Sequence, residues 1–469
     1  MERVEKMIQR GAALWRGLTA FIQANPAVAA VSVFSVLYSF GALLSGSRLG
    51  IDSEGNMTNP DFQMFCWYTV GRYSLIWLKD LLGMRPLNLF AENFLMMTVM
   101  AICGVVFSWY FYERSGNSGR MKSFCLAFPL LFLTHPCLMQ QFVFTLQAFE
   151  VAVCLLAAVT AAWLASRWAF SGGLRRAGLW LSLALMVFSF GGYQAMAAVY
   201  LTAALAFYLV SWRFDVGAGG YRKAAFRHAA AFAAGYLLYS LFVKAVLFWY
   251  FGPDFQPVYL DNQILWLSFP VSDCIRNVAG YVRDVCLGSS PYYGKWFLFF
   301  AVLMALHVGK CVCSGMRKEA WLYAAAALAL AASPFFLSLY LGSAVTMRTQ
   351  LSLPIASAFL GASVLSLLKP RRLPGFLFAV LVGFAGLVQG NISSRAAFTA
   401  QKAYEIDCST ALQIDAEARR LGASDRGQHI AMIGQFSPAL PESADLRCEV
   451  IGASLFGWDA AGPIGVSGR

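Results

Sequence analysis

Long apolar segments recur along the whole chain, and they constrain its fold more than any other feature. Many windows exceed the roughly 17 residues that a helix needs to cross a hydrocarbon core of about 30 Å. Hydrophobic residues make up 59% of the chain and charged residues only 13%, against about 25% charged residues in soluble domains. The alternating strands of outer-membrane barrels are absent, so the spans must be helical. The sequence therefore predicts an all-α polytopic membrane protein.

About eleven segments are expected to span the membrane. They cover roughly residues 27–47, 88–112, 124–142, 146–166, 178–192, 194–212, 229–251, 296–312, 320–342, 347–368 and 375–391. The two short segments on either side of Tyr193 are also compatible with a re-entrant hairpin. No short cleavable signal sequence is present, so we expect the first span to remain as an anchor.

In this arrangement of spans, the basic residues gather on one side of the membrane. With the N-terminus inside, the internal segments hold more than half of the 36 Lys and Arg residues, and the short external hairpins hold almost none. This is the positive-inside pattern. The net charge of +12 therefore reflects the orientation of the chain in the membrane and does not indicate nucleic-acid binding. We predict a bacterial inner-membrane location with the N-terminus cytoplasmic and the C-terminus periplasmic.

The regions outside the spans divide the chain further. The apolar residues of segment 1–26 form one stripe at helical spacing, so this segment is predicted to be a cytoplasmic interfacial helix. Two long external loops, 48–87 and 252–295, interrupt the transmembrane domain of residues 27–391, and loops of this length usually have a function. Residues 60–80 have the spacing of a helix that lies along the membrane surface. Residues 392–469 are predicted to form a small periplasmic α/β-like appendage.

Motifs for nucleotide or metal chemistry are missing. The chain has no GxxxxGK[ST] loop, no HExxH and no GxSxG, and its four histidines are scattered. None of the eleven cysteines has the CxxC spacing of a zinc site. We therefore expect no cofactor and no metal site, although the sequence leaves metal dependence open. The external pairs Cys408–Cys448 and Cys274–Cys286 are compatible with disulfides or with free thiols.

Charges within the apolar segments all fall near the external side. Glu92, Glu150, Lys244 and Arg348 lie in or beside spans, where a charge is costly and usually functional, and each is placed in the outward half. The cytoplasmic halves carry almost no charge. A site that opens to the outside, beneath the first external loop, explains this asymmetry.

Two acidic residues, Asp52 and Glu54, lie near the start of that first loop and are separated by Ser53. A carboxylate that is partly desolvated at the membrane rim can accept a proton, as a general base does. The alternative is a solvated loop or a helix N-cap, which Asp and Ser also favour.

Arginines and amides complete the candidate site. The guanidinium groups of Arg72 and Arg348 can bind phosphate in a bidentate manner, or they can reach toward lipid headgroups. Polar side chains at the outer ends of spans suit a ligand rich in hydroxyl groups, or they can join helices together. These side chains are Gln140, Gln141, Tyr193, Gln194 and Gln350.

Several motifs taken together resemble those of a known family. They are Ile51-Asp52-Ser53-Glu54-Gly55, Gly71-Arg72-Tyr73-Ser74-Leu75, Gly192-Tyr193-Gln194, Met347-Arg348, and the segment from Ile451 to Asp459. In order and topology the chain resembles the bacterial serotype-converting O-antigen glucosyltransferases of the Gtr type, which are polytopic sugar transferases of the GT-C kind. Members often carry two adjacent acids, whereas here Ser53 separates Asp52 from Glu54.

The resemblance implies a glycosyltransferase that uses an undecaprenyl-phosphate-linked sugar, usually glucose, on the periplasmic face. The acceptor would be O-antigen or another surface polysaccharide, and the anomeric centre would be inverted. Asp52 is the leading candidate for the base and Glu54 the alternate. We assign Arg72, Arg348 and Lys244 to the donor phosphate. The residues assigned to substrate binding are Glu92, Gln141, Glu150, Tyr193, Gln194 and Gln350.

Other functions fit the same composition. A lipid-linked-sugar flippase or a polysaccharide transporter would need polar residues through both leaflets, and the inner halves of the spans lack charges. Another GT-C transferase or an O-antigen polymerase would share most of the features described above.

Overall fold

The computed structural model describes residues 2–46, 48–50, 53–171, 176–216, 220–255, 264–314, 319–368, 372–422, 436–442 and 445–457. Within these ranges the secondary structure is helical, with no strand and one isolated bridge between Cys448 and Ile451. The predicted all-α class is therefore confirmed.

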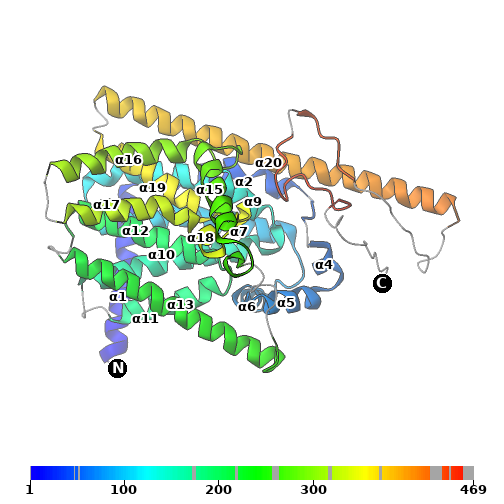
Figure 1. Ribbon diagram of the computed structural model, residues 1–469, viewed down its shortest axis with the longest axis horizontal. Helices are drawn as coiled ribbons and strands as arrows, with labels where there is room; N and C mark the ends of the chain where they lie inside the picture. The colour runs from blue at the N-terminus through cyan, green and yellow to red at the C-terminus, as the bar shows by residue number, and fades with distance from the viewer. Residues whose placement is uncertain are drawn as a thin grey trace.

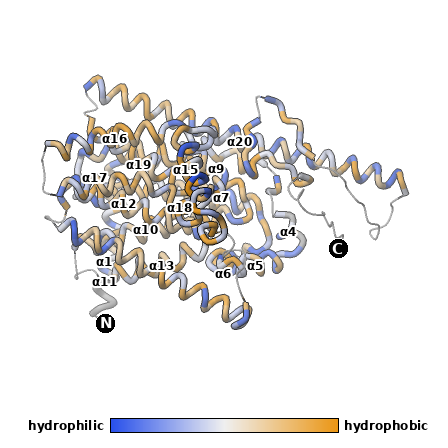
Figure 2. The backbone as a smooth tube through the Cα atoms, in the orientation of Figure 1, coloured by the Kyte–Doolittle hydropathy of each residue, from blue (hydrophilic) through white to orange (hydrophobic). Residues whose placement is uncertain are grey.

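Most helices lie side by side in one bundle (Figure 1). In the part of the chain that the structure describes, seven helices are long and apolar enough to cross a membrane, and Figure 2 shows how apolar residues dominate the bundle. They are α7 (Leu89–Arg114), α10 with its preceding turn (Thr145–Ser171), α12 (Met196–Arg213), α13 (Tyr221–Phe251), α16 (Trp296–Cys313), α17 with α18 (Ala320–Leu341) and α20 (Leu373–Arg420).

Helices α1 (Glu2–Ala24) and α2 (Pro26–Phe40) are together long and apolar enough to form an eighth span, but they are bent by 84° relative to each other. The remaining predicted spans are shorter or broken. They correspond to α8 (Lys122–Leu133) with α9 (Cys137–Phe142), to α11 (Arg176–Phe190) and to α19 (Ser352–Leu367). Every predicted segment thus contains helix, but the count of eleven spans is not confirmed.

The first long loop forms three helices, α4 (Ser53–Thr58), α5 (Pro60–Thr69) and α6 (Tyr73–Leu82). The prediction of one surface helix over 60–80 is wrong, because Gly71 has a left-handed φ of 73° and separates α5 from α6. The N-terminal half of α6 is buried, and the Ser74 N–H donates to the Gly191 carbonyl between α11 and α12 (3.0 Å). The loop therefore folds onto one end of the bundle, which we call the α4–α6 end.

The last helix, α20, has 48 residues. At 1.5 Å per residue it is about 72 Å long, more than twice the thickness of a hydrocarbon core, and it extends beyond the α4–α6 end (Figure 1). Residues 392–420 continue this helix, so the predicted domain boundary at 391 falls within one element. The α/β character of the tail is not confirmed, and its predicted apolar run at 428–434 lies outside the described residues.

The second long loop contains α15 (Val271–Leu287). Cys274 and Cys286 both lie on this helix, about 18 Å apart along its axis, which is too far for a disulfide. Cys408 and Cys448 are also free thiols. Neither pair considered from the sequence is bonded.

Candidate active site

A buried turn of residues 143–147 joins α9 to α10 at the α4–α6 end. The Gln147 N–H donates to the Phe144 carbonyl (3.2 Å), and the Thr145 N–H donates to the Val143 carbonyl (3.0 Å). Helix α4 packs against this turn. We call it the α9–α10 turn, and several of the predicted site residues meet around it.

Arg72 reaches the turn from the junction between α5 and α6. Its Nη1 donates to Oε1 of Gln147 (3.4 Å), and its guanidinium lies over the Tyr193 ring, 5.0 Å from the ring centroid. Nε2 of Gln194 donates to the Val70 carbonyl (2.7 Å) and so fixes the backbone just before Gly71. The structure thus brings together the predicted residues Arg72, Tyr193 and Gln194.

Arg348 approaches the same turn from the short segment Met347–Thr349, before α19. Its guanidinium lies over the Phe144 ring, 4.9 Å from the centroid. The Met347 N–H donates to Oε1 of Glu449 in the tail (2.7 Å). Burial raises the pKa of Glu449, and the hydrogen bond from Met347 and the charge of Arg348 oppose that rise.

These two arginines therefore contact residues of a single hydrogen-bonded turn, Gln147 and Phe144. They reach it from loops that are far apart in the sequence. Two guanidinium groups on one turn provide positive charge and several N–H donors, an arrangement suited to phosphate oxygens.

Residues on either side of Asp52 lie close to this turn in space. Gly50 is close to the Val143 carbonyl, since a Cβ on Gly50 would lie 3.4 Å from that oxygen. Asp52 lies outside the described residues. Glu54 belongs to α4, which begins at the buried Ser53. Gly50 and α4, which come before and after Asp52 in the sequence, thus both lie beside the α9–α10 turn.

Glu92 and Glu150 have a different environment from the one predicted. Both contact the ammonium group of Lys79, with 2.8 Å between Nζ and Oε1 of Glu150, and all three side chains are fully buried. Sequence reasoning missed Lys79, because the helix was predicted to lie on the surface. The available signal was the presence of two acids within apolar segments, which require a nearby cation.

The other predicted residues are distributed around the site. Lys244 is exposed on α13, next to Val243, which packs against Gly71. Gln350 is buried and its Nε2 donates to the Tyr281 hydroxyl. Gln141 is fully buried, and neither of its amide atoms has a hydrogen-bond partner among the described residues.

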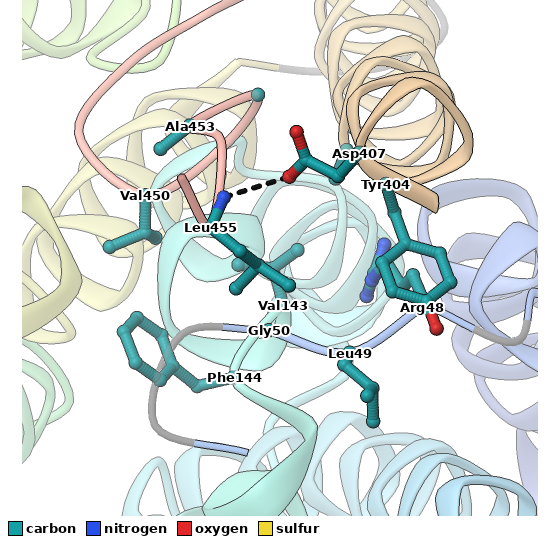
Figure 3. A pocket seen from close by; sticks show the side chains of 12 residues that line it. Arg48, Leu49, Gly50, Val143, Phe144, Tyr404, Asp407, Val450, Ala453 and Leu455 are labelled. Carbon is teal, nitrogen blue, oxygen red and sulfur yellow. Dashed lines mark hydrogen bonds between the residues drawn. The ribbon is translucent and has the colours of Figure 1, made fainter. Parts of the chain in front are cut away.

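A small cavity of about 30 Å³ adjoins the α9–α10 turn. Its walls come from the first loop (Arg48 to Gly50), the turn (Val143 and Phe144), α20 and the tail, as Figure 3 shows. Asp407 of α20 fixes the tail wall by accepting hydrogen bonds from the Ser454 hydroxyl (2.6 Å) and the Leu455 N–H (2.7 Å). Arg48 was not predicted as a site residue, and its position directly before the acidic motif was the only signal.

Metal ligands do not cluster in the described ranges, where no group of three or more His, Cys, Asp or Glu side chains could hold an ion. The chemistry at the α4–α6 end is that of arginines, amides and carboxylates.

The bundle of apolar helices and the charged site at one end define a polytopic membrane protein. The family model described as Glucosyl transferase GtrII matches residues 41–366, and the chain belongs to this family. The protein is therefore a membrane glycosyltransferase, as the motifs predicted. No curated protein and no solved structure matches the chain. The matched region includes Arg48, Arg72, the α9–α10 turn and Arg348, and it ends before α20 and the tail.

Proposed function

We propose that this protein transfers glucose from undecaprenyl phosphate to O-antigen on the periplasmic face of the bacterial inner membrane. In this proposal eleven segments span the membrane, the N-terminus is cytoplasmic, and the α4–α6 end faces the periplasm. Family membership supports the transfer of glucose. The positive-inside pattern of the loops supports the orientation.

The observation that carries the proposal is the convergence of Arg72 and Arg348 on the α9–α10 turn. When the glycosidic bond to a lipid phosphate breaks, negative charge develops on the phosphate oxygen. Fixed guanidinium groups stabilise that charge more strongly in the transition state than in the ground state. No strong general acid is then needed for the leaving group.

The transfer is a single displacement. The acceptor hydroxyl oxygen attacks the anomeric carbon on the face opposite the phosphate, and its proton passes to the carboxylate of Asp52, with Glu54 as the alternate base. The bond between the anomeric carbon and the phosphate oxygen breaks, and its electron pair stays on the phosphate. The products are the glucosylated acceptor with inverted configuration and undecaprenyl phosphate, and the energy comes from the donor bond.

The remaining polar residues would position the two substrates. The amide atoms of Gln141 have no hydrogen-bond partner within the described ranges, and this side chain is suited to sugar hydroxyls, together with Tyr193, Gln194 and Gln350. Lys244 is exposed at the flank of the bundle and would attract the phosphate headgroup of the donor. Glu92 and Glu150 would act on the substrate only indirectly, through the placement of α6 by Lys79.

The experiment that tests this function is structural analysis of the surface polysaccharide with and without the gene. We expect a glucose side branch that disappears on deletion and returns with the wild-type protein, while the Asp52→Asn, Glu54→Gln double variant fails to restore it. Loss of all exported polysaccharide on deletion would instead indicate a flippase or a polymerase. An unchanged polysaccharide would contradict the proposal.

A further inference from the structure

Arg48 is a buried cation that forms no ion pair among the described residues. Its side chain belongs to a residue that is only 6% exposed, and its Nε and Nη2 have no hydrogen-bond partner among the described residues. Burial lowers its pKa to about 10, so the group is still charged at neutral pH. A buried guanidinium that lacks a partner is energetically unfavourable, and such a feature is expected where a ligand supplies the missing charge.

The cavity beside Arg48 limits the size of that ligand. A water molecule needs about 10–15 Å³ of such space, so a volume of about 30 Å³ accommodates two or three oxygen-sized atoms. This volume matches the free oxygens of a phosphate group better than a whole sugar ring.

The acidic side chain in the described cavity lining, Asp407, forms no ion pair with Arg48. Asp407 lines the same cavity, but its two carboxylate oxygens already accept hydrogen bonds from Ser454 and Leu455. Figure 3 shows the Arg48 guanidinium beside Tyr404, with Asp407 turned toward the backbone of Leu455. In the part of the chain that the structure describes, Nε and Nη2 of Arg48 are thus without an acceptor and can donate to a bound ligand.

We propose that Arg48 binds a phosphate oxygen of the lipid-linked donor in the cavity between the first loop, the α9–α10 turn and the tail. This inference rests on the proposed function and adds a third arginine to the donor subsite. Phe144 connects the cavity of Arg48 with Arg348, because it lines that cavity and also lies under the guanidinium of Arg348.

The geometry also assigns a role to the tail. Residues 450–455 form one wall of the cavity, and Asp407 attaches that wall to α20. The phosphate bound by Arg48 would thus be shielded from water by a segment outside the part matched by the family.

The test uses the full-length protein in neutral detergent and follows thermal unfolding with added ligands. We expect undecaprenyl phosphate to raise the unfolding temperature of the wild type, and undecaprenol to have no such effect. In Arg48→Met, loss of the charge-assisted hydrogen bonds should weaken binding of undecaprenyl phosphate roughly 10- to 100-fold. Without ligand, Arg48→Met should be as stable as the wild type or more so, since it removes an unpaired buried charge.

Arg85→Met is the matched control, because Arg85 lies in the same loop and forms exposed ion pairs with Asp80 and Asp61. It should bind undecaprenyl phosphate like the wild type. Equal affinity in Arg48→Met would overturn the proposal, and so would a loss of stability without ligand, which would make Arg48 structural. An equal response of the wild type to phosphatidylglycerol or inorganic phosphate would overturn the donor assignment.

The outcomes distinguish an error in the role of Arg48 from an error in the proposed function. If Arg48→Met binds the donor normally and glucose is still added to the polysaccharide, only the role of Arg48 is wrong. If the wild type neither binds undecaprenyl phosphate nor changes the polysaccharide, the proposed function is wrong as well.

Discussion

Lys79 of α6 lies 2.8 Å from the carboxylate of Glu150 at the start of α10, and Glu92 of α7 contacts the same ammonium group. These three fully buried charges join a loop helix to two helices of the bundle. Arg72 lies at the N-terminal end of α6, two helical turns before Lys79. The charge cluster therefore holds α6 against the bundle. Because Arg72 lies at the start of α6, the position of α6 sets the position of Arg72.

Lys79→Met removes the cation and keeps a side chain of similar length. Because two buried carboxylates then lack a partner, we expect the free energy of unfolding to fall by about 3–5 kcal/mol. Thermal unfolding in detergent measures this change. Lys402→Met, in an exposed pair with Glu405, should have little effect, and adding Glu92→Gln and Glu150→Gln to Lys79→Met should restore much of the stability. Wild-type stability in Lys79→Met would exclude the structural role.

Arg348→Lys keeps the positive charge but removes the planar fork that lies over Phe144. A lysine ammonium cannot bind phosphate oxygens in a bidentate manner, so kcat/KM for the lipid-linked donor should fall by roughly 10- to 100-fold. Transfer assays with membranes and added donor measure this loss. Arg85→Lys is the control, because Arg85 forms exposed ion pairs with Asp61 and Asp80, and its donor kinetics should match the wild type. Unchanged donor kinetics in a folded Arg348→Lys protein would leave Arg348 as a headgroup anchor.

The sequence predicted the helices of the bundle and singled out Arg72 and Arg348, which meet at the α9–α10 turn, because hydrophobicity and the positions of rare charges are local properties. It did not predict the break at Gly71, since a single left-handed residue is needed to turn α6 into the protein. The pairing of Lys79 with Glu92 and Glu150 was not predicted either. It depends on three elements that meet only after the loop has folded.

The tail shows a second limit of the sequence. Residues 392–420 are charged, and this change in composition suggested a separate appendage, yet the helix of the last span continues through them. Composition indicates where a helix leaves the membrane and not where it ends. The burial of Arg48 likewise depends on residues 450–455, which are about 400 positions away along the chain.

Asp407→Asn should release the tail from α20. The amide of Asn presents only one acceptor oxygen, so one of the hydrogen bonds from Ser454 and Leu455 is lost, at a cost of about 1–3 kcal/mol. Hydrogen exchange of the amides in residues 445–457 should become faster. Asp415→Asn, on the exposed part of the same helix and paired with Arg419, serves as the control. Identical exchange in both variants would show that Asp407 does not hold the tail.

Reporter fusions test the orientation of the chain. Helix α20 is about 72 Å long, so fusions after Arg372 and after Arg420 should report opposite sides of the membrane, with the first cytoplasmic and the second periplasmic. A fusion after Phe251, at the end of α13, should also report the periplasm. If the two fusions around α20 report the same side, this helix does not cross the membrane and the periplasmic position of the site is wrong.

The identity of the base is tested by Asp52→Asn and Glu54→Gln. Each substitution preserves size and much of the hydrogen bonding but removes the ability to accept a proton at neutral pH. If Asp52 is the base, Asp52→Asn should reduce kcat by about 10²–10⁴-fold, with binding of undecaprenyl phosphate retained because the arginines are intact. Glu54→Gln should be milder. Sugar transfer in membranes supplied with lipid-linked donor, normalised to protein abundance, measures both. Near-normal turnover in Asp52→Asn together with an inactive Glu54→Gln would move the role to Glu54, and full activity in both variants would exclude this motif as the source of the base.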